Sequence, residues 1–224
     1  DNSNVRVTGS GNLNSMVPGL LVNTDLGIRG TAGATWRTKK IDLVLVLDNT
    51  GSMSSSGKMT ALKTAAKNLI DTMALVSNRP DAIRIGIVPF DTQVRIGTTY
   101  KNESWLTYSG SGTNANSWTG CVTDRDQSHD VADTTPDTAV PATLFRARNC
   151  TNSNLTTLMT LSTDWTALKA KVDAMSPAGN TNVTIGLAWG LHMLTPSQPL
   201  TTARTLATEP DLERIIILLT DGDN

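Results

Sequence analysis

A run of apolar residues that ends abruptly in a carboxylate constrains this chain most. Residues 41–47 read Ile-Asp-Leu-Val-Leu-Val-Leu, and Asp48 follows directly, before Asn-Thr-Gly-Ser. So nearly continuous an apolar run is typical of a parallel strand that is covered on both faces. Thr50 and Ser52 add two hydroxyls at alternate positions after the carboxylate. Because ligands bind beyond the carboxyl ends of strands in open α/β sheets, these oxygens are half of a candidate site.

Other periodic segments predict the remaining elements of an α/β domain. A helix is expected over 58–76, with Leu62, Ala66, Leu69, Met73 and Val76 on its apolar face. Its lysines, Lys58, Lys63 and Lys67, are expected on the solvent side. Further strands are predicted at 83–90, 93–96 and 215–219, and further helices at 164–175 and 183–194. Ser162 or Thr163 is expected to cap the helix at 164–175.

The order of these elements predicts a doubly wound fold, with a mostly parallel sheet and helices on both faces. Residues 93–96 would form an antiparallel edge hairpin with the preceding strand. The 183–194 helix is apolar nearly all round, so we expect it to be well buried, with His192 as a packing residue near its end. Residues 1–40 alternate only weakly and are interpreted as flanking strands or an arm, with one strand suggested around 19–23. The main domain would span 41–224.

Residues 98–160 interrupt the pattern and are predicted to be an irregular insertion with a role of its own. They contain both cysteines of the chain, Cys121 and Cys150. A disulfide between them would close a loop of about 30 residues and stabilise the fold by roughly 3–4 kcal/mol. Two unpaired buried thiols are the alternative. The polar context favours the disulfide, and with it an extracytoplasmic location.

Composition excludes several classes of protein. The net charge is −1, which gives no support to nucleic-acid binding, since that requires a basic surface. No run of about 18 apolar residues exists, so no membrane span is expected in residues 1–224. A zinc site made only of Cys and His would need both cysteines together with His129 and His192, and their spacing does not suggest one.

The second half of the candidate site comes from two later loops. Asp221 follows the 215–219 strand, and Thr181 lies in the Gly-Asn-Thr-Asn loop before a buried helix. The predicted ligand set is Asp48, Thr50, Ser52, Thr181 and Asp221. All five offer oxygen, which favours Mg²⁺, Mn²⁺ or Ca²⁺ over softer metals. With only two carboxylates, the ion would be left able to accept a carboxylate from another molecule, as a metal-mediated adhesion site requires.

This constellation resembles the metal-ion-dependent adhesion site (MIDAS) of von Willebrand factor A (vWA) domains. In that family Asp-x-Ser-x-Ser follows the first strand, a Thr lies in a later Gly-rich loop, and an Asp follows a further strand. Thr50 replaces the first Ser but keeps the hydroxyl. The resemblance implies a non-enzymatic module that binds a protein ligand through an exposed carboxylate.

The sequence around Asp48 and the Trp-Thr-Gly-Cys-Val-Thr-Asp-Arg stretch at 118–125 also resemble those of the TadG/TadE-like proteins of tight-adherence (Flp) pilus loci. That resemblance implies pilus or surface partners and a membrane anchor through a segment absent here. A vWA domain continues past its last Asp with further helices and a strand. The unit at 41–224 is therefore expected to be incomplete at its C-terminus. Asp223 is expected to be a loop residue rather than a ligand.

Two other interpretations also fit these residues. In the first, Asp48 is the nucleophile of a Mg²⁺-dependent phosphotransferase or phosphatase, since Asp-Asn-Thr-Gly-Ser is close to a phosphoacceptor motif. Asn49 replaces the lysine of that motif, and the sequence suggests no lysine beside the two strand ends. In the second, Asp48 and Asp221 only cap helices while Thr50 and Ser52 only form turns.

Overall fold

The computed structural model describes residues 2–13, 26–37 and 39–222, which form two compact units. The suggested strand at 19–23 and Asp223 lie outside the described residues. The first unit is an antiparallel hairpin of β1 (Asn2–Leu13) and β2 (Leu26–Arg37). The flanking strands expected within residues 1–40 are therefore present, with 12 residues each. The described side chains at 5–11 and 29–34 are exposed, so no buried face imposes an apolar alternation on the sequence.

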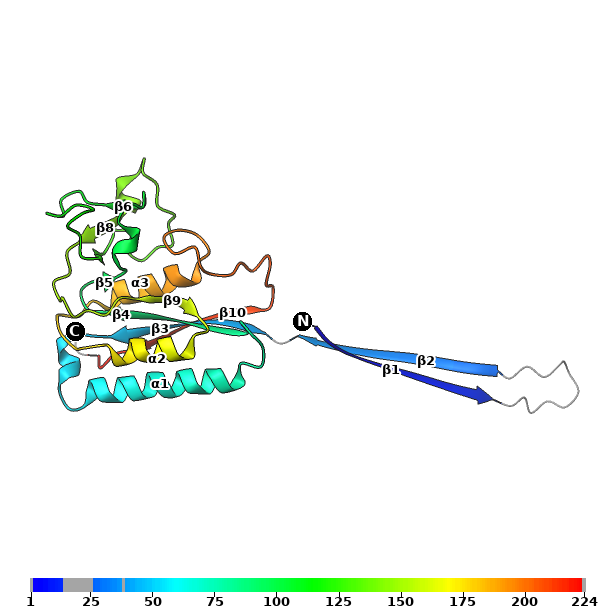
Figure 1. Ribbon diagram of the computed structural model, residues 1–224. Helices are drawn as coiled ribbons and strands as arrows, with labels where there is room; N and C mark the ends of the chain where they lie inside the picture. The colour runs from blue at the N-terminus through cyan, green and yellow to red at the C-terminus, as the bar shows by residue number, and fades with distance from the viewer. Residues whose placement is uncertain (1, 14–25, 38, 223–224) are drawn as a thin grey trace, which may run out of the picture. The chain divides into compact units, whose positions relative to one another are not determined.

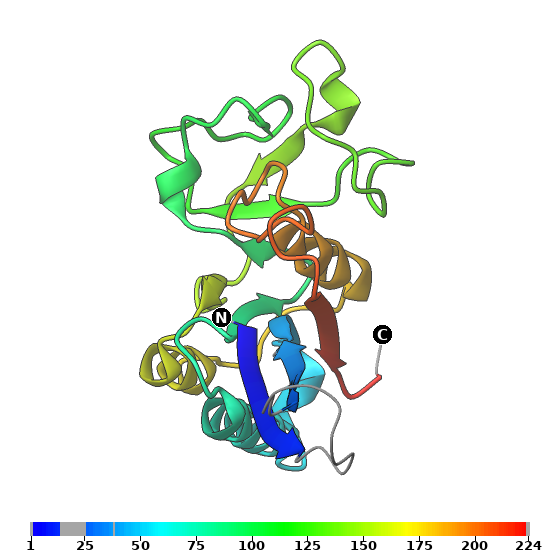
Figure 2. The same ribbon diagram turned by 90° about the vertical axis from the view of Figure 1, so that its right-hand side faces the viewer.

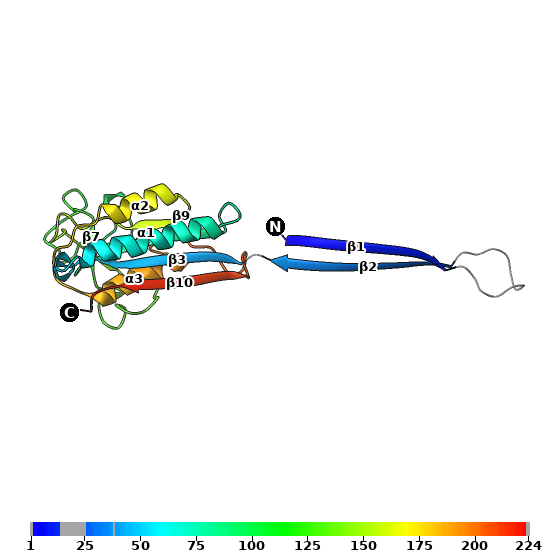
Figure 3. The ribbon, with the colours of Figure 1, turned by 90° about the horizontal axis from the view of Figure 1, so that it is seen from below.

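The second unit is built on three parallel strands. β3 (Lys40–Asp48) lies between β10 (Leu212–Leu219) and β4 (Ile83–Phe90), as Figure 3 shows for β3 and β10. Leu47 pairs with Leu219, so the loops after β3 and β10 begin at the same level. The predicted bounds of β4 are confirmed, whereas β10 begins three residues before the predicted strand.

Helices cover both faces of this sheet, as predicted (Figure 1). α1 (Lys58–Val76) and α2 (Trp165–Asp173) pack on one face, and α3 (Val183–Leu194) packs on the other. β3 serves both layers because successive side chains of a strand point to opposite faces. Leu43, Leu45 and Leu47 face α1 and α2, while Val44 and Val46 face α3. The predicted bounds of α1 and α3 are confirmed.

Two details of the helices differ from the expectation. The cap of α2 is Asp164, whose carboxylate accepts a hydrogen bond of 2.9 Å from the Ala167 amide. Ser162 instead accepts from the amide of Asp164, at 3.0 Å. On α3, Leu187 and Leu191 are 38% and 37% exposed, so this helix is buried on one side only.

The apolar face of α1 also needs one correction. Val76, the last residue of α1, is 57% exposed, whereas Leu62 and Ala66 are buried as predicted. Ile70, which the predicted face omitted, is fully buried.

Residues 98–160 are irregular over most of their length, as predicted, but contain short strands that extend the sheet (Figure 2, in green). β5 (Val94–Arg95) pairs with β4 and also with β7, so the prediction of an edge strand there is wrong. The order continues to β8 and β6. Outside this path, β9 pairs antiparallel with β4 at Ile85 and Ile87. The strands of this region are β6 (Leu106–Thr107), β7 (Cys121–Thr123), β8 (Phe145–Arg148) and β9 (Met159–Ser162). Short 3-10 helices are η1 (Gly51–Ser54), η2 (Thr98–Tyr100) and η3 (Pro141–Thr143).

A buried ion pair explains the one charge inside the apolar run of β3. Asp42 is completely buried, and the Nη2 atom of Arg84 lies 2.7 Å from its Oδ2. Arg204, on the connection before β10, contacts its other oxygen at 2.5 Å. Burial by itself raises the pKa of Asp42, but the two guanidinium groups outweigh it and lower that pKa. The triad therefore fastens the 195–211 connection to the core sheet. No helix within the described part of the chain is long and apolar enough to cross a membrane.

His192 is a packing residue, as expected. It is 2% exposed and makes edge contacts with the rings of Phe145 and Trp189. Its Nδ1 lies 3.6 Å from Asp133 and has no hydrogen-bond partner among the described residues. Burial, and then the neighbouring positive charge of Arg125, lower the pKa of His192 to about 3.

This lowered pKa predicts a loss of stability in mild acid. The unfolded chain binds the proton of His192 near pH 6.5, whereas the folded chain does not until about pH 3. The contribution is complete above pH 6.5 and is lost as the pH falls toward 3, by about 2 kcal/mol at pH 5. We expect His192→Gln to remove this part of the difference between urea unfolding free energies at pH 7.5 and pH 5. An unchanged difference in the variant would show that other groups cause the acid sensitivity.

Candidate metal centre

Asp48 is held rigidly at the end of β3. It is completely buried, and its Oδ1 accepts a hydrogen bond of 2.9 Å from the backbone amide of Thr50. Its Oδ2 accepts a hydrogen bond of 2.7 Å from the hydroxyl of Thr220, which follows β10. The carboxylate therefore links the carboxyl ends of the two parallel strands.

A chain of hydrogen bonds joins Asp48 to three other predicted ligands. The hydroxyl oxygens of Thr50 and Ser52 lie 3.0 Å apart, and the Ser52 hydroxyl donates to Oδ1 of Asp221 at 3.2 Å. The pairing of Leu47 with Leu219 accounts for this meeting, because it brings the two loops to one edge of the sheet. The structure thus brings together Asp48, Thr50, Ser52 and Asp221.

The loop that contains Thr181 lies against the same edge. The amide of Gly51 donates to the carbonyl of Gly179 at 2.9 Å, and the amide of Ala178 donates to the carbonyl of Asn49 at 2.9 Å. Gly179 has a φ of +86°, and a Cβ there would lie 3.0 Å from Oδ2 of Asp91, so only glycine suits this position. These contacts bring the loop that contains Thr181 to the edge where the other four residues lie.

Lys58 was expected on the solvent side of α1, and that prediction is wrong. Its Nζ lies 2.8 Å from Oδ2 of Asp221, and the side chains are 30% and 6% exposed. Lys58 is the first residue of α1, which begins just beyond the candidate site, so its long side chain reaches back to Asp221. The sequence signal was its place as the first helical residue after the Asp-Asn-Thr-Gly-Ser motif.

Residues outside the predicted set support the Thr181 loop. Asn182 caps α3, and its side-chain amide donates to Oδ2 of Asp124 at 2.6 Å. The backbone amide of Asn182 donates to the carbonyl of Asp91 at 3.0 Å. Burial raises the pKa of both Asp124 and Asp91. Asp124 follows β7, so the loop of Thr181 is fastened directly to the inserted strands. In the sequence, only the position of Asn182 directly before a helical apolar segment indicates its capping role.

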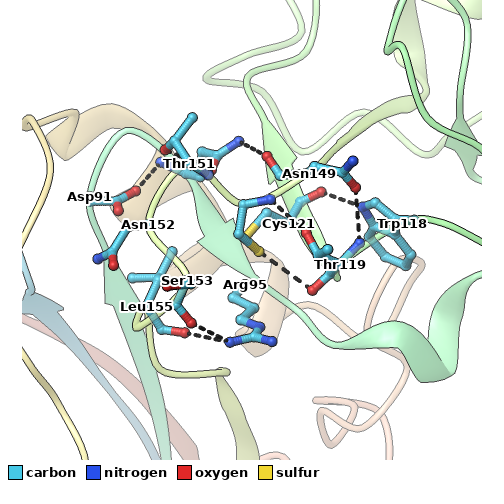
Figure 4. The surroundings of a disulfide bond; sticks show 12 residues. Asp91, Arg95, Trp118, Thr119, Cys121, Asn149, Thr151, Asn152, Ser153 and Leu155 are labelled. Carbon is cyan, nitrogen blue, oxygen red and sulfur yellow. Dashed lines mark hydrogen bonds between the residues drawn. A yellow bond between two sulfur atoms is a disulfide. The ribbon is translucent and has the colours of Figure 1, made fainter.

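The predicted disulfide between Cys121 and Cys150 is confirmed, with a Cα–Cα distance of 5.1 Å (Figure 4). Both thiols are therefore unavailable to a zinc ion. The segment after Cys150 also contacts the residue before β5, because Oε1 of Gln93 accepts a hydrogen bond from the Thr151 amide at 2.8 Å. Arg95 donates to the carbonyl of Ser153 at 3.1 Å.

The donor set suits a hard divalent cation. Two carboxylates and three hydroxyls are the oxygen donors that Mg²⁺, Mn²⁺ and Ca²⁺ accept. Within residues 2–13, 26–37 and 39–222, no three His, Cys, Asp or Glu side chains are grouped to hold a metal. The candidate centre therefore depends on its hydroxyls, and Thr50 and Ser52 already lie within hydrogen-bond distance of each other.

Comparison with solved structures finds bacterial pilus proteins at low sequence identity. The vWF domain of the type V pili tip protein Mfa5 from Porphyromonas gingivalis is 15% identical, with a TM-score of 0.45, and the match covers 84% of this chain and 39% of that one. The tip pilin GBS104 from Group B Streptococcus agalactiae is 17% identical, with a TM-score of 0.45, over 83% of this chain and 46% of that one. The pilus adhesin RrgA from Streptococcus pneumoniae is 14% identical, with a TM-score of 0.45, over 97% and 22%.

The chain thus spans less than half of each of these three proteins. No curated protein matches it in sequence. A family match covers β3, α1, β4 and the first part of the insertion, including Asp48, Thr50 and Ser52 but neither Thr181 nor Asp221. Residues 42–109 match the von Willebrand factor type A domain.

Proposed function

We propose that this chain is an adhesion module that holds a divalent cation and uses it to bind an acidic residue of a partner protein. The observation that carries the proposal is the hydrogen-bonded chain from Asp48 through Thr50 and Ser52 to Asp221, at the ends of two parallel strands. The vWA match at 42–109 supports it independently, since that region contains the first three of these residues.

Asp48, Thr50, Ser52, Thr181 and Asp221 would hold Mg²⁺, or else Mn²⁺ or Ca²⁺. Such an ion, when bound, supplies the attraction for a carboxylate of the partner. The protein fixes the direction of approach, because Asp48 is buried on the sheet side and its two oxygens are oriented by Thr50 and Thr220. Two carboxylates only balance the charge of a divalent ion, which leaves it able to take another oxygen ligand.

We also propose an extracytoplasmic setting among pilus or surface proteins. The disulfide supports it, because such bonds persist in oxidising compartments. The pilus context rests on the resemblance of the motif and of residues 118–125 to TadG/TadE-like proteins, which also implies a membrane anchor elsewhere in the full protein. A net charge of −1 gives no support to nucleic-acid binding, and we propose a protein ligand with an exposed carboxylate.

Mn²⁺ binding tests this function directly. We expect the domain to bind one Mn²⁺ and Mg²⁺ to compete for the same site. The electron paramagnetic resonance signal of free Mn²⁺ measures both effects. Immobilised domain should then retain peptides that contain Asp or Glu in Mg²⁺ and release them in EDTA. Matched peptides with Asn or Gln are the control. Retention that survives EDTA would mean that another surface makes the contact.

A phosphatase is the second candidate, and one observation favours it. The structure places Lys58 beside Asp221, where the phosphotransferase interpretation needed a lysine that the sequence did not suggest. Against it, Asn49 occupies the position at which the phosphoacceptor motif has its lysine. Phosphate release from p-nitrophenyl phosphate in Mg²⁺ decides the matter. Turnover that Asp48→Asn abolishes would contradict the adhesion proposal.

A further inference from the structure

One positive charge lies inside the proposed metal centre. The Nζ atom of Lys58 is 2.8 Å from Oδ2 of Asp221, while Oδ1 of the same carboxylate accepts from Ser52. The Asp221 side chain is only 6% exposed, so solvent screens this pair less than it screens a pair on the open surface. The ammonium group thus contacts a carboxylate that a divalent cation would also need.

The position of Lys58 in its helix has an electrostatic cost. It is the first residue of α1, and the first turn of that helix contains no acidic residue. A cation at a helix N-terminus is unfavourable, because the helix dipole makes that end positive. The contact with Asp221 offsets this cost, which ties the placement of the lysine to the carboxylate rather than to the helix.

We propose that Lys58 is a built-in competitor for the metal: its ammonium group holds Asp221 until a divalent cation displaces it. This inference rests on the proposed function and adds to it the control of metal loading. The four-carbon stem of lysine is flexible, so the ammonium can leave Asp221 without movement of the backbone. The concentration of cation at which the centre fills would then depend on the strength of the Lys58–Asp221 pair.

The expected effect is large because like charges at this separation repel strongly. A cation held by Asp221 would lie within a few ångströms of Nζ unless the side chain moves away, and either event opposes binding. Lys58→Gln should therefore tighten Mn²⁺ binding by about tenfold or more. The same substitution should lower the melting temperature of the metal-free domain, because it removes an ion pair of a carboxylate that is nearly buried.

The experiment compares Mn²⁺ dissociation constants of wild-type protein, Lys58→Gln and Lys58→Arg, followed by electron paramagnetic resonance. Lys63→Gln is the matched control, because Lys63 lies on the same helix and donates to the carbonyl of Asp173 on α2. We expect tighter binding only in Lys58→Gln, with Lys58→Arg close to wild type. Lys58→Met replaces the Gln variant if circular dichroism shows that Gln prevents folding.

The outcomes separate this inference from the proposed function. If wild-type protein binds Mn²⁺ and Lys58→Gln binds it equally or more weakly, Lys58 is not a competitor, while the metal centre stands. If neither wild type nor any variant binds Mn²⁺, the metal centre itself is wrong, and the inference fails with it.

Discussion

We expect Mg²⁺ or Mn²⁺ to raise the melting temperature of the wild-type domain, and Asp48→Asn to abolish that rise. A ligand that binds only the folded state stabilises it by about 2.7 kcal/mol at 100 times its dissociation constant. For a domain of this size, each kcal/mol raises the melting temperature by roughly 2–4 °C. The substitution removes one of the two carboxylates of the predicted set, and neutral amide oxygens bind hard divalent cations much more weakly.

The asparagine variant suits this test because its shape preserves the local contacts. Its side-chain oxygen can still accept from the Thr50 amide, and its amide group can donate to the hydroxyl of Thr220. Asp173→Asn is the control, since it removes an equal charge from an exposed carboxylate that pairs with Lys67 on α1. Differential scanning fluorimetry in EDTA and in increasing MgCl₂ gives both shifts. A metal-dependent shift that persists in Asp48→Asn would place the cation elsewhere.

Sequence patterns predicted well those elements whose burial imposes a period. β4, α1 and α3 have the predicted bounds because buried apolar residues repeat along each of them at the spacing of its type. The carboxylates of Asp48 and Asp221 could be placed for a related reason, since each directly follows a buried strand. Parallel pairing then brings both to one edge of the sheet.

The misses have physical causes too. The strands of the insertion contain between two and four residues, which is too short for an alternation of apolar and polar residues to be recognised in the sequence. In the N-terminal hairpin, Val5 and Val7 are 48% and 61% exposed, so burial imposes no alternation of apolar residues by which the strands could be predicted. The environment of Lys58 was predicted wrongly because helical periodicity gives only the direction in which a residue leaves the helix. At a helix end, a long side chain can turn back past the first turn and contact the preceding loop.

Loss of the disulfide is expected to cost the domain about 3–4 kcal/mol of unfolding free energy, which is the chain-entropy value for a loop of this length. Cys121 and Cys150 are 29 positions apart, so the bond restricts a long stretch of the unfolded chain. Cys121 is fully buried, so alanine replaces it better than serine, because burying the serine hydroxyl would cost free energy. The variant Cys121→Ala/Cys150→Ser should therefore unfold at a lower urea concentration than oxidised wild-type protein.

Dithiothreitol supplies the matched control, because it should lower the urea midpoint of wild-type protein and leave that of the double variant unchanged. The metal-dependent shift should survive in the double variant. The loop of Thr181 is held by backbone contacts to Asn49 and Gly51 and by the bond from Asn182 to Asp124, none of which includes a cysteine. If the shift disappears with the disulfide while the domain stays folded, the bond positions the metal loop as well as stabilising the insertion. The route of coupling would then run from Cys121 through the neighbouring Asp124 to Asn182, and Asp124→Asn should reproduce the loss.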